Sequence, residues 1–229
     1  MNKDFDANGF VVLENIFTLE EAQKMRELSL KFFSRGKAKP DWIKEDNLQE
    51  LFQIIQSKKF ESIIEKEVGE KIELTNHNDL HLNRTVGWHK DRLNGEARQF
   101  EINSPWEQVS GQTMKIYKLD IYLQDHATNE DALTVRVGSH KSEHGKRGII
   151  KVLKPKMGDV VIVDQRISHR GQWSGGYDRV LVCLGYGVRN CFFEQFQKGT
   201  KFRQDKQNER QKTTITNGKM PDEQLNKFK

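Results

Sequence analysis

The first third of the chain combines one short apolar run with two stretches of helical periodicity. Residues 10–13 are apolar throughout, which is typical of a short strand. Thr18 followed three positions later by Glu21 forms a capping box, so a helix is predicted from there to about residue 34. A second apolar recurrence over residues 47–68 predicts one or two helices that end at Gly69. Each helical region has one apolar face, so we expect both to cover a sheet.

From residue 71 onward the hydrophobic period changes to two, which predicts strands. Apolar residues occupy the even positions: Ile72, Leu74, Leu80 and Leu82. Polar residues occupy the odd ones: Glu73, Thr75, His77, Asp79, His81 and Asn83. His89 and Asp91 continue the odd series, so a strand that keeps its register past Gly87 would carry them on its polar face.

The remaining strands follow at regular intervals. They are predicted at residues 113–124, 133–137, 149–153, 160–164 and 180–185. In the first of them, Leu119 and Ile121 share one face, whereas Lys118, Asp120 and Tyr122 share the other. This alternation suits a sheet with helices on one side and a polar cavity on the other. Seven or eight strands after N-terminal helices indicate a jelly roll or another sandwich backed by helices.

The basic charge of the chain is confined to its C-terminal segment. The net charge is +5, and residues 197–229 hold nine Lys or Arg against four Asp or Glu, so residues 1–196 are neutral overall. We therefore expect one folded domain over residues 1–196 and a polar, basic tail over 197–229, as a surface helix, an extended arm or a disordered segment. The tail lacks regularly spaced aromatic residues for stacking on bases, which makes a nucleic-acid partner unexpected.

Composition favours a cytoplasmic globular protein. The 229 residues are 35% hydrophobic, enough for one domain with a core. No apolar run approaches the ~18 residues of a membrane span, and the first residues lack the pattern of a signal peptide. Two cysteines, Cys183 and Cys191, do not make a disulfide framework. These features leave the oligomeric state open.

Candidate chemistry lies in the segment Gly87-Trp88-His89-Lys90-Asp91. Residues two apart in an extended chain point the same way, so His89 and Asp91 can supply two ligands of a 2-His-1-carboxylate Fe(II) site. His169 follows an apolar strand and is the candidate third ligand. Arg179, ten positions later, opens another strand and can pair with a carboxylate. A His-x-Asp pair alone is common by chance, so the prediction depends on all four residues.

The order and spacing of these residues resemble the phytanoyl-CoA dioxygenase family of Fe(II)/2-oxoglutarate oxygenases. The opening segment 8–14 and the hairpin ending in Gly138-Ser139-His140 are also similar to that family, so the resemblance covers about residues 8–190. It implies a mostly β fold with α-helices, a double-stranded β-helix (jelly roll, cupin-like) backed by N-terminal helices. It also implies Fe(II) bound by His89, Asp91 and His169, with O2 and 2-oxoglutarate as co-substrates and Arg179 binding the far carboxylate of 2-oxoglutarate.

Further site residues are selected by strand parity and polar type. Asn83 and Lys118 are candidate 2-oxoglutarate contacts, and His81, Tyr122 and Arg92 are candidate substrate contacts. The alternative is that these residues form hydrogen bonds inside the barrel or lie on a solvated rim. The long loop over residues 93–111, which contains Trp106, is a candidate lid. The pair His140 and His144 is expected to be structural or to lie at the substrate rim, not to bind metal.

The function these features predict is an Fe(II)- and 2-oxoglutarate-dependent dioxygenase. It would hydroxylate an unactivated carbon of a small organic molecule and release succinate and CO2. Within the resemblance, the retained carboxylate of Asp91 implies hydroxylation or desaturation in place of halogenation. Two alternatives are a cupin-like metal- or ligand-binding protein without oxygenase activity and a nucleic-acid-associated protein that uses the basic tail. The sequence does not identify the substrate.

Overall fold

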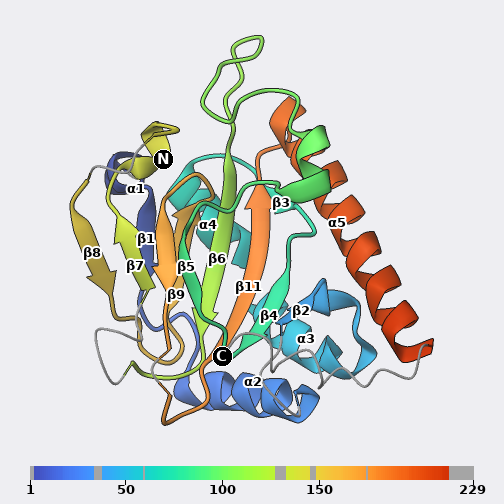
Figure 1. Cartoon of the computed structure of the whole chain (residues 1–229). Coiled ribbons are helices and arrows are strands. Elements are labelled where there is room, and N and C mark those ends of the chain that lie inside the picture. The colour runs from blue at the N-terminus through green and yellow to red at the C-terminus, as the bar shows by residue number, and fades with distance from the viewer. Residues whose placement is uncertain are drawn as a thin grey trace.

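Two antiparallel sheets face each other in the computed structural model, which describes residues 3–33, 38–58, 60–126, 133–144, 148–173 and 175–216 (Figure 1). The large sheet has the strand order β1-β9-β6-β11-β4-β2, with β3 pairing β11, and the small sheet has the order β5-β10-β7-β8. The large-sheet strands are β1 (Phe10–Leu13), β2 (Ala38–Pro40), β3 (Glu73–Leu74), β4 (Asp79–Leu82), β6 (Ile116–Tyr122), β9 (Val160–Asp164) and β11 (Val180–Gly187). The small-sheet strands are β5 (Val86–His89), β7 (Leu133–Arg136), β8 (Ile150–Leu153) and β10 (His169–Gly171). The predicted jelly roll is confirmed.

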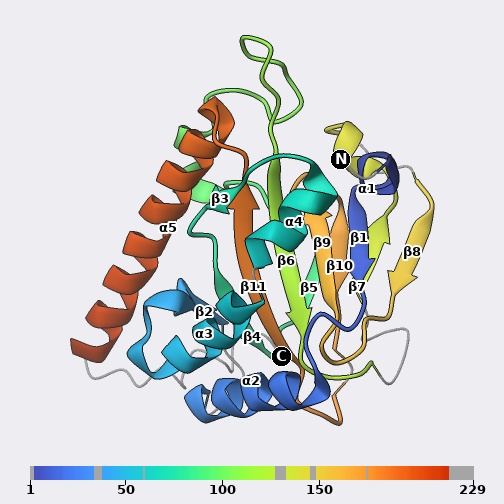
Figure 2. The same ribbon diagram turned by 180° about the vertical axis from the view of Figure 1, so that it is seen from behind.

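Helices cover the face of the large sheet that is turned away from the small sheet (Figure 2). The α-helices are α1 (Lys3–Asn8), α2 (Leu19–Phe32), α3 (Gln49–Ser57), α4 (Phe60–Val68) and α5 (Cys191–Thr216). Short 3-10 helices are η1 (Trp42–Lys44), η2 (Asp46–Leu48), η3 (Gly95–Phe100) and η4 (Ser139–Lys141). The predicted capping box is present, because the Glu21 amide donates to Thr18 Oγ1 over 3.2 Å and the Thr18 amide donates to Glu21 Oε2 over 2.8 Å.

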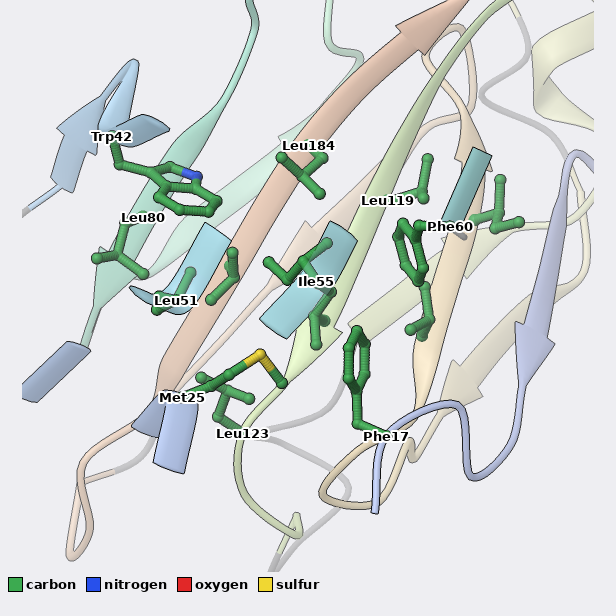
Figure 3. Packing of buried hydrophobic residues seen from close by; sticks show 14 of the residues in the cluster. Phe17, Met25, Trp42, Leu51, Ile55, Phe60, Leu80, Leu119, Leu123 and Leu184 are labelled. Atoms are coloured by element: carbon green, nitrogen blue, oxygen red, sulfur yellow. The ribbon is translucent and has the colours of Figure 1, made fainter. Parts of the chain in front are cut away.

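Two hydrophobic clusters follow from the alternation along the strands. Met25, Ile55 and Phe60 of the helices pack on Leu119 and Leu184 of the large sheet, and all five are essentially inaccessible to solvent (Figure 3). A second cluster lies between the sheets and includes Phe10, Tyr122, Val135, Val161, Leu181 and Cys183. Each fully buried large apolar side chain stabilises the fold by ~1.5–3 kcal/mol. The polar residues of the site share the inner face of the large sheet with this second cluster.

The chain changes sheets where the sequence predicted a possible continuous strand. β4 ends at Leu82 in the large sheet, and β5 begins at Val86 in the small sheet. Asn83 starts this crossing with a φ of 55°, a left-handed conformation that Asn tolerates better than most residues. The condition of one strand that keeps its register past Gly87 is therefore not met, and His89 faces the interior from the opposite sheet to His81.

The C-terminal helix α5 stands beside the large sheet, on the side of the molecule away from β7 and β8, and packs on η3 (Figure 1). The side chain of Asn190 caps its start, since Oδ1 accepts from the amides of Phe192 and Phe193 over 3.0 and 3.1 Å. Phe196 and Gln204 are buried against the domain, so α5 continues the fold across the boundary predicted at residue 196. Within the described ranges, no helix combines the length and apolarity needed to cross a bilayer.

Candidate metal centre and adjoining pocket

Three predicted ligands converge between the two sheets. His89 ends β5 and His169 begins β10, and these residues are direct partners in the antiparallel pair. Asp91 follows β5, and its amide donates to the carbonyl of Gln165 over 3.0 Å. Its Oδ1 lies 3.4 Å from His89 Nε2, and its Oδ2 lies 3.7 Å from His169 Nε2. One ligand atom from each residue lies within 4.8 Å of the others, which is compact enough for a single metal ion.

Backbone carbonyls orient both imidazoles. His89 Nδ1 lies 2.7 Å from the Gly87 carbonyl, and His169 Nδ1 lies 3.2 Å from the Ile167 carbonyl. A carbonyl only accepts, so each Nδ1 must donate and each Nε2 is directed toward Asp91. This arrangement fixes tautomer and ring orientation as outer-shell partners do in metal sites. Two imidazole nitrogens and one carboxylate form a donor set that fits Fe(II).

The charge of Asp91 is balanced by neighbouring cationic groups. Lys118 on β6 places Nζ 3.1 Å from Asp91 Oδ2, and both side chains are more than nine-tenths buried. Burial acts to raise the pKa of Asp91, but Lys118 and the two histidines outweigh it and hold the pKa well below its ordinary value. Burial lowers the pKa of His169, which favours the neutral imidazole that a metal requires.

A pocket extends from the triad across the inner face of the large sheet. It contains about 380 Å³ of empty space, part of it open to solvent. Its lining residues are His81, Arg84, Val86, His89, Lys118, Asp120, Tyr122, Leu133, His169, Gly171, Arg179 and Leu181. The metal ligands come from the small sheet and its exit, whereas Lys118, Asp120 and Tyr122 come from the large sheet.

Arg179 is the most deeply buried cationic residue of this pocket. It is 2% exposed, and its side chain donates a hydrogen bond from Nη1 to the Arg84 carbonyl over 3.3 Å. It forms no ion pair with any carboxylate among the described residues, and its Nε has no partner there. The buried Tyr122 hydroxyl likewise has no hydrogen-bond partner within the described structure. Buried donors are normally satisfied, so these groups can serve a ligand.

Asn83 has a different place from the one predicted. It is absent from the pocket lining, and its side chain is used to hold the turn before β11. Asn83 Oδ1 accepts from the Arg179 amide over 2.7 Å, and Nδ2 donates to Asp178 Oδ1 over 2.9 Å. It therefore positions Arg179 and does not reach into the pocket.

Arg92 and the loop at residues 93–111 also lie outside the pocket lining. Arg92 pairs with Glu101 over 2.6 Å and with Glu143 over 2.9 Å, so its charge is already neutralised. Trp106 of the loop donates from Nε1 to the His140 carbonyl over 2.8 Å and stacks under the Arg92 guanidinium. These contacts anchor the candidate lid to the domain.

The other histidines agree with a non-ligand role. His140 lies with Nε2 3.0 Å from the Asp6 carbonyl, and a Cβ on Gly9 would meet its ring at 2.3 Å. His144 is exposed. Among the described residues, only His89, Asp91 and His169 form a group compact enough for a metal.

Sequence reasoning missed two features, a carboxylate in the pocket lining and a buried His-Asp contact beside the pocket. Asp120 lies on the polar face of β6 between Lys118 and Tyr122, so strand parity alone identifies it as a lining residue. Beside the pocket, the buried His77 places Nε2 3.3 Å from Asp79 Oδ2, next to His81. Burial lowers the pKa of His81 to about 3, so this pocket residue stays neutral.

These features define the class of the fold: a double-stranded β-helix with two histidines and one carboxylate between its sheets. No family model matches the sequence, and no curated protein matches it. HygX from Streptomyces hygroscopicus, solved with nickel and 2-oxoglutarate, is 18% identical with a TM-score of 0.60, covering 80% of this chain and 84% of that chain. EctD from S. alaskensis, solved with bound Fe, is 15% identical with a TM-score of 0.61, covering 81% and 74%.

A third similar structure is SnoN, a non-heme alpha-ketoglutarate-dependent epimerase from nogalamycin biosynthesis. It is 15% identical with a TM-score of 0.60, covering 80% of this chain and 79% of that chain. At this level of identity the similarities establish the fold. The resemblance to the phytanoyl-CoA dioxygenase family in particular stays a prediction.

Proposed function

We propose that this protein is an Fe(II)- and 2-oxoglutarate-dependent dioxygenase that hydroxylates an unactivated carbon of a small organic molecule. One observation carries the proposal. The two histidines of the compact His-Asp-His group line the same pocket as Arg179, a buried arginine that pairs with no carboxylate among the described residues. A dicarboxylate such as 2-oxoglutarate needs a metal ion to chelate at one end and a cation such as Arg179 to pair with the carboxylate at the other end.

The residue roles follow from their positions. His89, Asp91 and His169 hold the iron, and Arg179 binds the far carboxylate of 2-oxoglutarate through charge-assisted hydrogen bonds. Fe(II) with 2-oxoglutarate and O2 would supply oxidative decarboxylation to succinate and CO2, coupled to oxidation of a substrate C–H bond. Tyr122, whose hydroxyl is unpartnered, and Lys118 are further co-substrate or substrate contacts.

The remaining residues exclude water from the pocket and hold Arg179 in position. Val86, Leu133 and Leu181 supply apolar lining that excludes water from the reacting atoms. Asn83 holds the backbone of Arg179. Asp91 in the carboxylate position favours hydroxylation over halogenation.

Similar structures support this function. HygX is described with 2-oxoglutarate and hygromycin B bound, which supports a small-molecule substrate here. SnoN is described as an alpha-ketoglutarate-dependent epimerase, so this co-substrate also occurs on a similar fold with an outcome other than hydroxylation. The cupin-like alternative without oxygenase activity would leave unexplained why Arg179 is buried with no carboxylate partner among the described residues.

The test is succinate release by the purified protein with Fe(II), 2-oxoglutarate and O2 across a panel of small metabolites. His169→Ala should lower succinate release at least about a hundredfold, because even outer-shell partners of metal ligands are worth 10–100-fold. His144→Ala, at an exposed histidine outside the site, is the matched control and should behave as the unchanged protein. Equal succinate release from His169→Ala and His144→Ala would refute the proposal, and metal binding without succinate release would favour the cupin-like alternative.

A further inference from the structure

We propose that a groove between α5 and the turn at residues 94–97 binds the anionic group of a hydroxyl-bearing small molecule, through Arg203 and Lys206. This α5 groove is lined by Asn94, Gly95, Glu96, Ala97, Phe202, Arg203, Lys206 and Gln207. It contains about 700 Å³ of empty space, including space open to solvent. It shares no lining residue with the metal-site pocket, so the inference does not depend on the proposed oxygenase chemistry.

Arg203 provides the main evidence that this groove binds a ligand. Its side chain is partly buried, and its Nε is shielded from solvent without a hydrogen-bond partner in the described structure. The charge of Arg203 helps to lower the pKa of the buried Asp79, but the groups within 4.0 Å of that carboxylate are the imidazoles of His77 and His81. A shielded guanidinium N–H that no protein group satisfies is unfavourable unless a ligand supplies the acceptor.

The rest of the groove completes an anion site with polar flanks. Lys206 is exposed, lies 5.8 Å over the ring of Phe202, and pairs with Glu209 only at 3.8 Å. Such an exposed pair is weak, so the ammonium can turn to a ligand anion. Gln207 Oε1 is shielded and unpartnered within the described residues, and it can accept from a ligand hydroxyl. Glu96 lies on the opposite wall and is the acidic residue of the lining.

The groove is preformed because α5 is tightly attached on both sides of it. Gly199 lets the helix approach Leu93, whose Cδ1 would lie 2.4 Å from a Cβ at that position. Gln204 Nε2 donates to the Asn76 carbonyl over 2.5 Å, and Phe202 packs on Phe100 with ring centroids 5.4 Å apart. A rigid groove loses little freedom when a ligand binds.

Arg203 shares its main features with Arg179, the arginine of the metal-site pocket. Both arginines lie in pockets, both have an Nε without a partner among the described residues, and neither forms an ion pair there. Arg92 and Arg166, in contrast, are paired with carboxylates at 2.6 Å. Carboxylate and phosphate groups are the usual partners of such arginines.

The test is calorimetric titration of the full-length protein, freed of metal by dialysis, with inorganic phosphate and separately with citrate. Arg203→Gln should weaken binding of the preferred probe at least about tenfold, as expected for a charge-assisted partner. Lys206→Gln should weaken it several-fold. Lys201→Gln removes the same charge from an exposed lysine that pairs with Asp205 at 3.1 Å, so it controls for net charge and should bind as the unchanged protein.

Arg179→Gln is the control for binding in the metal-site pocket. This variant should bind the preferred probe with the affinity of the unchanged protein. A preference for phosphate or for citrate identifies the ligand's anionic group. The proposal is overturned if neither probe binds saturably, if Arg203→Gln binds as the unchanged protein, or if Arg179→Gln abolishes the binding. If Arg203→Gln does not fold, as judged by its melting curve, Lys206→Gln and Lys201→Gln decide: equal affinities in these two variants would overturn the proposal.

Discussion

At the scale of single residues, the pocket holds two buried polar groups without a hydrogen-bond partner in the described structure, Arg179 Nε and the Tyr122 hydroxyl. Lys90 donates to the carbonyls of Ser139 and Arg166, both over 2.6 Å, so it is fully used in the fold. Arg179 has far weaker protein contacts at nearly complete burial. Desolvating an arginine without a counter-ion is costly, which a ligand carboxylate offsets.

Asn83 gives a residue-scale prediction about how Arg179 is held. Asn83→Ala should destabilise the protein by about 2 kcal/mol, because it loses the bonds to Arg179 and Asp178 and places alanine at a left-handed φ. Asn83→Gly keeps the conformation and should cost only about 1 kcal/mol. Urea unfolding measures both values. Equal stability of the two variants would contradict a conformational role for Asn83.

Residue type and order predicted which side chains meet, but not which are already paired. His89, Asp91, His169 and Arg179 come together as expected because strand parity fixes direction and β5 pairs β10. Arg92 could not be separated from Arg179 by sequence, because its partners Glu101 and Glu143 lie 9 and 51 positions away in the chain. Such long-range pairing depends on tertiary structure.

At the scale of elements, periodicity predicted α2, α3, α4 and most strands but missed α1, β2 and β10. Strand β10 has three residues and carries no periodicity of its own, so only its pairing with β5 and β7 defines it. The crossing at Asn83 was missed because a turn of this kind leaves the alternation on either side intact. The start of α5 was not separable from the preceding strand, because aromatic residues such as Phe192 and Phe193 suit either element.

The attachment of α5 gives an element-scale prediction. Gly199→Ala should destabilise the protein by about 1 kcal/mol, because overpacking against Leu93 (~1–3 kcal/mol) exceeds the ~1 kcal/mol gained in helix propensity. Thermal or urea unfolding measures the change. A stabilised Gly199→Ala variant would show that Leu93 moves freely.

A double substitution tests the contact itself. Leu93→Ala alone should cost ~2–5 kcal/mol, since Leu93 is buried. In Gly199→Ala/Leu93→Ala the clash is gone, so the loss should be smaller than the sum of the single losses by at least ~0.5 kcal/mol. Strict additivity would mean that the two residues do not interact.

At the scale of the whole molecule, the two sheets contribute different residues to the site. His89 and His169 belong to the small sheet, whereas Lys118 and Tyr122 belong to the large sheet and Arg179 directly precedes its strand β11. A ligand that contacts the metal and Arg179 therefore bridges the sheets. Sequence alone could not separate a jelly roll from another sandwich, because the alternation is the same in both; the facing of the sheets is a property of the assembled fold.

The central claim is that metal and Arg179 bind the two ends of one 2-oxoglutarate molecule. Calorimetric titration of 2-oxoglutarate into the nickel-loaded protein tests it most directly, because nickel avoids turnover and HygX was solved with nickel and 2-oxoglutarate. We predict binding of one equivalent that requires the metal and weakens at least about a hundredfold in Arg179→Ala, since an unpaired buried charge costs ~2–5 kcal/mol. Equal 2-oxoglutarate affinity without metal, or in Arg179→Ala, would contradict the account.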